Sequence, residues 1–182
     1  MNRDEFWHLI EKGNKEKTTE QKLALWTTAL ARAREEDIFT FYDIMHTYFR
    51  LADQEHILAA ANIIFPDCSD DEFDGFRAWL ISQGEDAYRS VLAEPEYLIE
   101  LCSPEEEHRM DKLLQVPFEA YFQKNKNAGN YRGFSAAQEN LGLTPIQKNL
   151  LEEEITLAWD ISEPWETDEL PFLFPRLFEK FN

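Results

Sequence analysis

The chain has 182 residues, and its 36 Asp and Glu against 18 Lys and Arg give a formal net charge of −18 at pH 7. This charge repels nucleic-acid phosphates and anionic lipid headgroups, so it argues against binding to nucleic acid or to a membrane. With 43% hydrophobic and 14% aromatic residues, the chain is too apolar for a disordered protein. We therefore predict one folded domain over residues 1–182, of a size that buries a single core.

Signals for the start of a helix, each followed by apolar residues at helical spacing, recur in the first part of the chain. Asn2 with Glu5 predicts a capped helix that ends at Gly13, and Thr18 or Thr19 opens a second helix. Steps of three or four residues separate the apolar positions of a third helix, which are Ile38, Phe41, Met45, Tyr48 and Ala52. Each segment has the period of a helix that buries one face.

The middle of the chain continues this pattern. Asp53 is the predicted cap of a fourth helix, and Ser69 with Glu72 forms a capping box for a fifth, which ends at Gly84. Residues 85–102 contain a proline among apolar residues, which predicts either two short helices or one broken helix.

Prolines dominate the predictions for the last part. Ser103 and the proline after it predict a helix start, and Pro117 should kink or interrupt that helix. Residues 125–133 are rich in Asn and Gly and predict a surface loop, whereas Thr144 opens a last long helix that reaches Ala158. Three later prolines, Pro164, Pro171 and Pro175, predict an irregular tail. The many apolar residues of this tail predict that it packs on the domain.

No run of residues alternates in the manner of a strand. We therefore predict an all-α protein, an irregular multi-helix bundle of about seven to nine helices.

All four histidines follow an acidic residue by three positions, in the pairs Glu5 and His8, Asp43 and His46, Asp53 and His56, and Glu105 and His108. Two Glu-x-x-His pairs on separate helices, with two further Glu residues, can bind a di-metal centre inside a bundle. A di-metal enzyme is therefore the alternative function. The first turn of a helix favours acidic residues without any metal, and only two of the pairs contain Glu, so we expect no metal site.

No other pattern predicts a catalytic residue or a cofactor. The five acidic residues in the range 67–74 do not have the spacing of an EF-hand loop, and they fit the start of a helix. Their negative charge also disfavours the thiolate form of Cys68. GxGxxG, P-loop, HExxH and GxSxG patterns are missing from the sequence. Two cysteines, a charged N-terminus and no apolar run of about 18 residues predict reduced thiols and a cytoplasmic protein.

Residues 149–175 are acidic and contain no Lys or Arg. Aromatic side chains among these carboxylates could give a basic protein both hot-spot contacts and complementary charge. A tail that packs on the domain and exposes a solvated acidic face explains the same pattern equally well. On the first interpretation, the partner-binding residues are Glu152, Glu153, Glu154, Trp159, Asp160, Trp165, Glu166, Asp168 and Glu169.

Three segments, residues 6–10, 67–73 and 76–84, resemble the bacterial family called "domain of unknown function 4240". The resemblance covers about residues 1–125, and residues 126–182 form an acidic C-terminal extension that we expect to pack on this part. The family's activity is unassigned. The resemblance implies a polar site that family members share, formed by Asp70, Asp71 and Arg77.

Charge, resemblance and missing motifs together predict a cytosolic binding protein for a basic protein. Small acidic helical proteins of this kind are often immunity proteins, so the predicted partner is a toxin enzyme such as an ADP-ribosyltransferase or a nuclease, with its active site occluded. A regulatory protein-interaction module is a further alternative to the di-metal enzyme.

Overall fold

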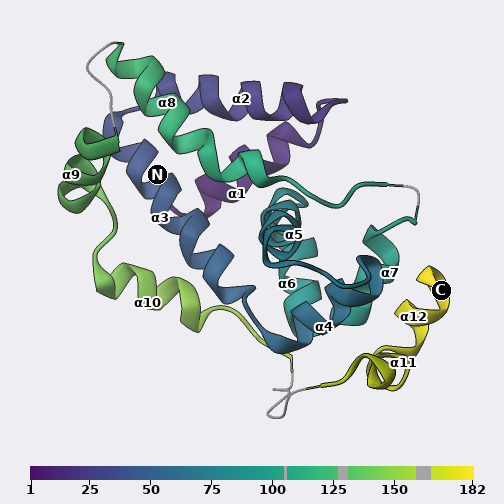
Figure 1. Cartoon of the computed structure of the whole chain (residues 1–182). Coiled ribbons are helices and arrows are strands. Elements are labelled where there is room, and N and C mark those ends of the chain that lie inside the picture. The colour runs from purple at the N-terminus through teal and green to yellow at the C-terminus, as the bar shows by residue number, and fades with distance from the viewer. Residues whose placement is uncertain (105, 127–130, 159–164) are drawn as a thin grey trace.

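The computed structural model describes residues 1–104, 106–126, 131–158 and 165–182, and in these ranges the chain is all-α with no strand. Three 3-10 helices lie at Pro95–Tyr97, Asp111–Gln115 and Thr167–Glu169. The described α-helices, labelled in Figure 1, are α1 (Arg3–Gly13), α2 (Thr19–Arg32), α3 (Glu35–Leu51), α4 (Glu55–Ile64), α5 (Asp70–Ser82), α6 (Glu85–Ala93), α7 (Leu98–Leu101), α8 (Val116–Asn125), α9 (Tyr131–Leu141), α10 (Pro145–Glu153), α11 (Leu170–Leu173) and α12 (Pro175–Phe181).

Three of the predicted capping boxes are confirmed. Asn2 caps α1 with Glu5, and Ser69 caps α5 with Glu72. The box at the start of α10 is formed by Thr144 and Gln147. In each box the cap side chain accepts from the backbone N–H three residues later, and that residue's side chain accepts from the cap N–H, so two donors that have no partner inside the helix are satisfied.

Helix α3 runs through the middle of the molecule. It packs against α1, α2, α5 and α8 on one side and against α9 and α10 on the other (Figure 1). The aromatic core lies where α1 crosses α3: the rings of Trp7 and Tyr48 stack with centroids 4.9 Å apart, and Phe6 packs 4.9 Å from Phe41. Such pairs add about 0.5–1.5 kcal/mol each beyond the burial of their surface, so this junction fixes the position of α1.

The predicted number of helices was too low, since the described residues contain twelve α-helices. Proline is the main reason, because the sequence interpretation treated it as a helix breaker. In the structure Pro117, Pro171 and Pro175 each lie in the first turn of a helix, where the missing N–H has no intrahelical partner in any case. The tail after residue 164 therefore contains α11 and α12.

Several predicted boundaries were also wrong: α5 ends at Ser82 rather than at Gly84, and α9 begins at Tyr131, inside the predicted loop. The cap of α4 is Gln54, one residue after Asp53, and α10 ends at Glu153 instead of reaching Ala158. No helix starts at Ser103, because the described residues between there and Met110 cross α5 without regular structure. The N–H of Met110 donates to the carbonyl of Gly75 on α5 at 3.0 Å, and this long-range bond replaces a helical one.

A buried carboxylate connects α3 to the C-terminal part of the chain. Asp43 is 3% exposed, and its Oδ1 accepts from Lys148 Nζ at 2.7 Å and from Gln138 Nε2 at 2.9 Å. Its Oδ2 accepts from the backbone N–H of Leu143 at 2.6 Å. These partners lie in α9, in α10 and in the connection between them, so one side chain determines how this helix pair lies on α3.

Helices α11 and α12 pack at the opposite end of the molecule, against α4 and α7 (Figure 1). Leu170, Phe174 and Leu177 are buried there, and Lys180 Nζ donates to two carbonyls at the end of α7. No helix in the described ranges has both the length and the apolar character that a membrane crossing requires.

Candidate functional site

The three glutamates at the end of α10 do not form the free acidic surface that the sequence suggested. Glu152 forms an ion pair with Arg50, and Glu154 pairs with Arg3. Glu153 is exposed and, of the three, is the one that forms no ion pair with any residue that the structure describes. Two of the three acids therefore bind cations from the N-terminal part of the same chain.

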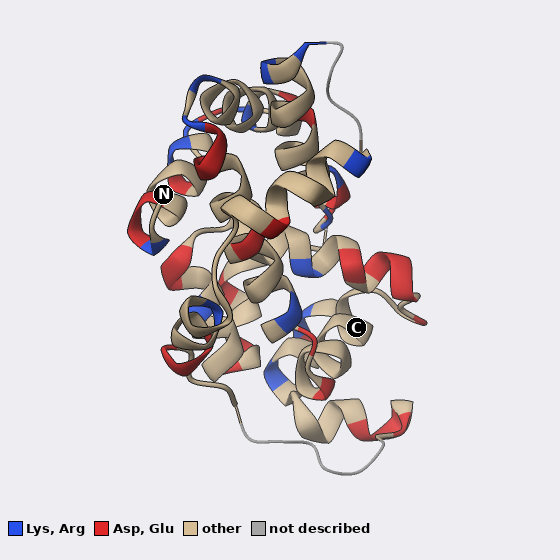
Figure 2. Ribbon diagram, turned by 90° about the vertical axis from the view of Figure 1, so that its left-hand side faces the viewer, with Lys and Arg blue, Asp and Glu red and all other residues tan. Residues whose placement is uncertain are grey.

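The remaining residues of the predicted acidic surface differ in their exposure and in their contacts. Trp159 and Asp160 lie outside the described residues. Trp165 is partly buried, and its indole N–H donates to Glu55 Oε2 at 3.2 Å. Glu166, Asp168 and Glu169 are exposed, although the Glu169 carboxylate caps its own 3-10 helix by accepting from the Glu166 N–H. Figure 2 shows that acidic residues, in red, are spread over most of the ribbon rather than collected in this segment.

The outer face of α10 exposes apolar side chains that the sequence had not identified as surface residues. Ile146 is 73% exposed and Leu150 is 54% exposed, one helical turn apart, and the exposed Glu153 continues the same face. Only Leu151 of this helix is buried. The sequence shows apolar residues on both faces of the segment, so periodicity alone could not assign the inner face to Leu151.

The implied polar site of Asp70, Asp71 and Arg77 is not assembled. Asp70 and Asp71 are exposed in the first turn of α5, where acids complement the helix dipole. Arg77 is buried and pairs with Asp74 on its own helix and, at 3.3 Å, with Asp53. Its guanidinium also lies over the rings of Phe49 and Phe73, at 4.1 and 4.8 Å from their centroids. This arrangement connects α5 to the end of α3.

The acid-x-x-His pairs do not converge either. His8 is exposed on α1, whereas His108 is buried, with its ring 5.0 Å from Trp79 and its Nε2 accepting from the Ser103 N–H at 3.1 Å. Glu105 lies outside the described residues. Among the residues that are described, no three His, Cys, Asp or Glu side chains are placed to share a metal ion.

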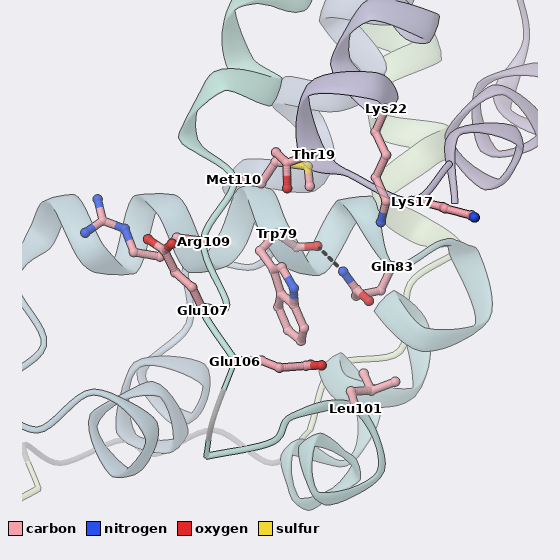
Figure 3. Close-up of a pocket in the computed structure, with 10 residues that line it drawn as sticks. All are labelled: Lys17, Thr19, Lys22, Trp79, Gln83, Leu101, Glu106, Glu107, Arg109 and Met110. Carbon is pink, nitrogen blue, oxygen red and sulfur yellow. Dashed lines mark hydrogen bonds between the residues drawn. The ribbon is translucent and has the colours of Figure 1, made fainter. Parts of the chain in front are cut away.

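A pocket of about 380 Å³ opens beside residues 76–84, one of the three segments that resemble the family (Figure 3). Its volume lies within the range of small-ligand sites. Trp79 comes from α5 and Gln83 follows its last residue. The other lining residues come from the start of α2 and the loop before it, from α7 and from the segment before η2 (Asp111–Gln115): Lys17, Thr19, Lys22, Leu101, Glu106, Glu107, Arg109 and Met110. The sequence interpretation missed these flanking residues, because they are distant in the chain and belong to no motif.

The thiols do not have the character of nucleophiles. Burial, together with the charge of Glu72, raises the pKa of Cys68 to about 11, and burial raises the pKa of Cys102 to about 12. A thiol with a raised pKa is mostly protonated at neutral pH, and the protonated form is unreactive.

We therefore expect the folded protein at pH 8 to react with iodoacetamide at least about tenfold more slowly than free cysteine, since raising the pKa lowers the thiolate fraction. The rate should recover in denaturant. Mass spectrometry of alkylated peptides measures both rates, and native labelling of Cys68 at the free-cysteine rate would contradict the expectation.

No curated protein and no solved structure matches this chain. A family model described as "Protein of unknown function (DUF4240)" matches residues 1–123, so the match ends within α8 and leaves out α9 to α12. Because the match covers more than half of the chain, as the resemblance predicted, the protein belongs to the DUF4240 family.

Proposed function

We propose that this protein acts by binding a basic protein, and that the outer face of α10 is the contact surface. The observation that carries the proposal is the exposure of Ile146 and Leu150, 73% and 54%, on one face of a regular helix. Large apolar side chains that lie together on a surface mark interaction sites, and their burial supplies most of the affinity of an interface. Glu153 on the same face adds a charge complementary to a basic partner.

The attachment of α10 supports this proposal. The bonds that Asp43 accepts from Lys148 and from the Leu143 N–H fix the start of the helix against α3, and the pair of Arg50 with Glu152 fixes its end. A surface that is ordered before binding loses less conformational entropy when the partner arrives. The face of α10 therefore has the rigidity that a tight contact requires.

We propose further that the partner is a toxin enzyme and that this chain is its immunity protein. Enzymes that act on nucleic acids or nucleotides carry basic surfaces, because they bind phosphates. The net charge of −18 complements such a surface and speeds capture, which an inhibitor of a toxin needs. Toxin nucleases and ADP-ribosyltransferases are the two classes that fit this chemistry.

The test is affinity capture from the native cell with the wild-type chain and with the double variant Ile146→Ser/Leu150→Ser. We expect the wild type to enrich one basic protein, and the double variant to bind it about a hundredfold or more weakly, as for the loss of two hot-spot side chains. Mass spectrometry identifies the partner, and titration of the purified pair gives the dissociation constants.

Phe172→Ser is the matched control, because Phe172 is 85% exposed but lies on α11. If this control weakens binding and the α10 double variant does not, the assignment of the surface is wrong.

Charge reversal tests the electrostatic part. Glu153→Lys should slow association and flatten its salt dependence, whereas Glu100→Lys, an equal change on α7, should have a smaller effect. Reversal of Glu152 or Glu154 is a poorer test, because it also breaks pairs within the chain.

The immunity role predicts that the captured partner stops growth when expressed alone and that co-expression of the wild-type chain restores growth. A harmless partner would reject that role and leave the binding surface in place.

A further inference from the structure

The Trp79 pocket contains charged side chains of both signs, and several of them form no ion pair with a residue that the structure describes. Lys17, Glu106 and Glu107 form no ion pair with a described residue, and the ammonium of Lys22 only donates to the Asn14 side chain at 3.3 Å. In Figure 3 the Lys22 ammonium lies directly above Gln83 and the Glu106 carboxylate lies below it, whereas the Lys17 side chain points to the side, away from Trp79. Lys22 and Glu106 thus lie on opposite sides of Gln83 and form no ion pair with each other.

The floor between these charges is aromatic and polar. The Trp79 indole lies near the middle of the pocket residues, held by stacking on Phe76 at 5.5 Å and by the edge of His108 at 5.0 Å (Figure 3). The Gln83 amide donates to the Trp79 carbonyl at 3.2 Å, which fixes the amide and leaves its oxygen as an acceptor. Leu101 adds an apolar wall.

We infer that this pocket binds a small zwitterion of amino-acid or dipeptide size. Its carboxylate pairs with Lys22, its ammonium with Glu106 and the Gln83 oxygen, and its apolar part contacts Trp79 and Leu101. A pure anion leaves the Glu106 carboxylate without a partner in the pocket, and a pure cation leaves the Lys22 ammonium without one. A zwitterion supplies a partner for both charged side chains. The pocket is independent of the α10 surface.

The test follows the indole N–H signal of Trp79 by NMR while single amino acids and dipeptides are added at millimolar concentration. We expect at least one of them to shift this signal in a saturable way. Its N-acetylated form, which lacks the ammonium, and its amide, which lacks the carboxylate, should each bind at least about tenfold more weakly, the loss expected for one charge-assisted contact. No shift with any zwitterion, or equal binding of the blocked forms, would overturn the inference.

Two variants on the pocket rim identify the contacts without touching the core. Lys22→Gln and Glu106→Gln should each weaken binding of that ligand about tenfold. Lys15→Gln and Glu100→Gln are matched controls, because they remove the same charges outside the pocket and should leave the affinity unchanged. Equal losses in controls and rim variants would show that the net charge, and not the pocket, governs binding, and would reject the site.

Discussion

Replacing Asp43 with Ala is expected to lower the free energy of unfolding by about 3 kcal/mol and to free α9 and α10 from α3. Removal of one member of a buried ion pair costs about 3–5 kcal/mol, because the other charge stays buried without a partner. Lys148 is 34% exposed and can regain water, so the lower end of this range applies. Urea denaturation measures the loss of stability, and hydrogen exchange should rise within residues 131–153.

Two comparisons separate this effect from a general loss of charge. Asp86→Ala removes an exposed acid on α6 and should change stability by less than about 0.5 kcal/mol. Adding Lys148→Gln to Asp43→Ala should cost little more, because the lysine then has no carboxylate to lose. Unchanged exchange in α9 and α10 after Asp43→Ala would mean that apolar packing alone holds these helices.

Gly13→Ala should destabilise the protein by about 2 kcal/mol, although alanine favours helix more than glycine does. A Cβ at Gly13 would overlap the Trp26 ring, coming within 2.6 Å of its Cζ2 and closer to two other ring atoms. Trp26 is completely buried, and its indole N–H donates to the Leu9 carbonyl at 2.9 Å, so the ring cannot move aside. Overpacking costs about 1–3 kcal/mol, which exceeds the gain of about 0.5–1 kcal/mol in helix propensity.

Thermal or urea denaturation measures this effect, and a second substitution tests its cause. In the background Trp26→Phe, whose ring is smaller, Gly13→Ala should cost less than in the wild type. Gly75→Ala is the matched control, since a Cβ there would meet the ends of the Arg109 and Asp111 side chains, which are partly exposed. Equal losses in both Trp26 backgrounds would show that the clash is not with this ring.

The sequence predicted helix starts well where neighbouring residues alone form the cap. Asn2, Ser69 and Thr144 all cap helices as expected, because a capping box involves only residues three positions apart. Ser103 has the same pattern and starts no helix. There the burial of His108 against Trp79 and the bond from Met110 to Gly75 outweigh the local preference, and no sequence window contains those partners.

The candidate sites were harder to predict for the same reason. Arg50 and Glu152 are 102 positions apart, so the acidic run looked unpaired in the sequence although part of it is neutralised in the fold. The pocket joins Lys22, Trp79 and Glu106 from three distant segments. Composition gave the net charge, and the motifs predicted the family. Which face of α10 is exposed could be determined only from the packing of that helix in the structure.

The position of Asp43 has a consequence for relatives of this protein. Asp43 lies within residues 1–123, which the family model matches, yet every hydrogen-bond donor that the structure gives to its carboxylate lies after residue 123. A homologue that stops after α8 would leave a carboxylate at this position facing water or an apolar neighbour, with nothing to compensate it. Aspartate here should therefore accompany the appended helices through evolution, and shorter homologues should carry a different residue in its place.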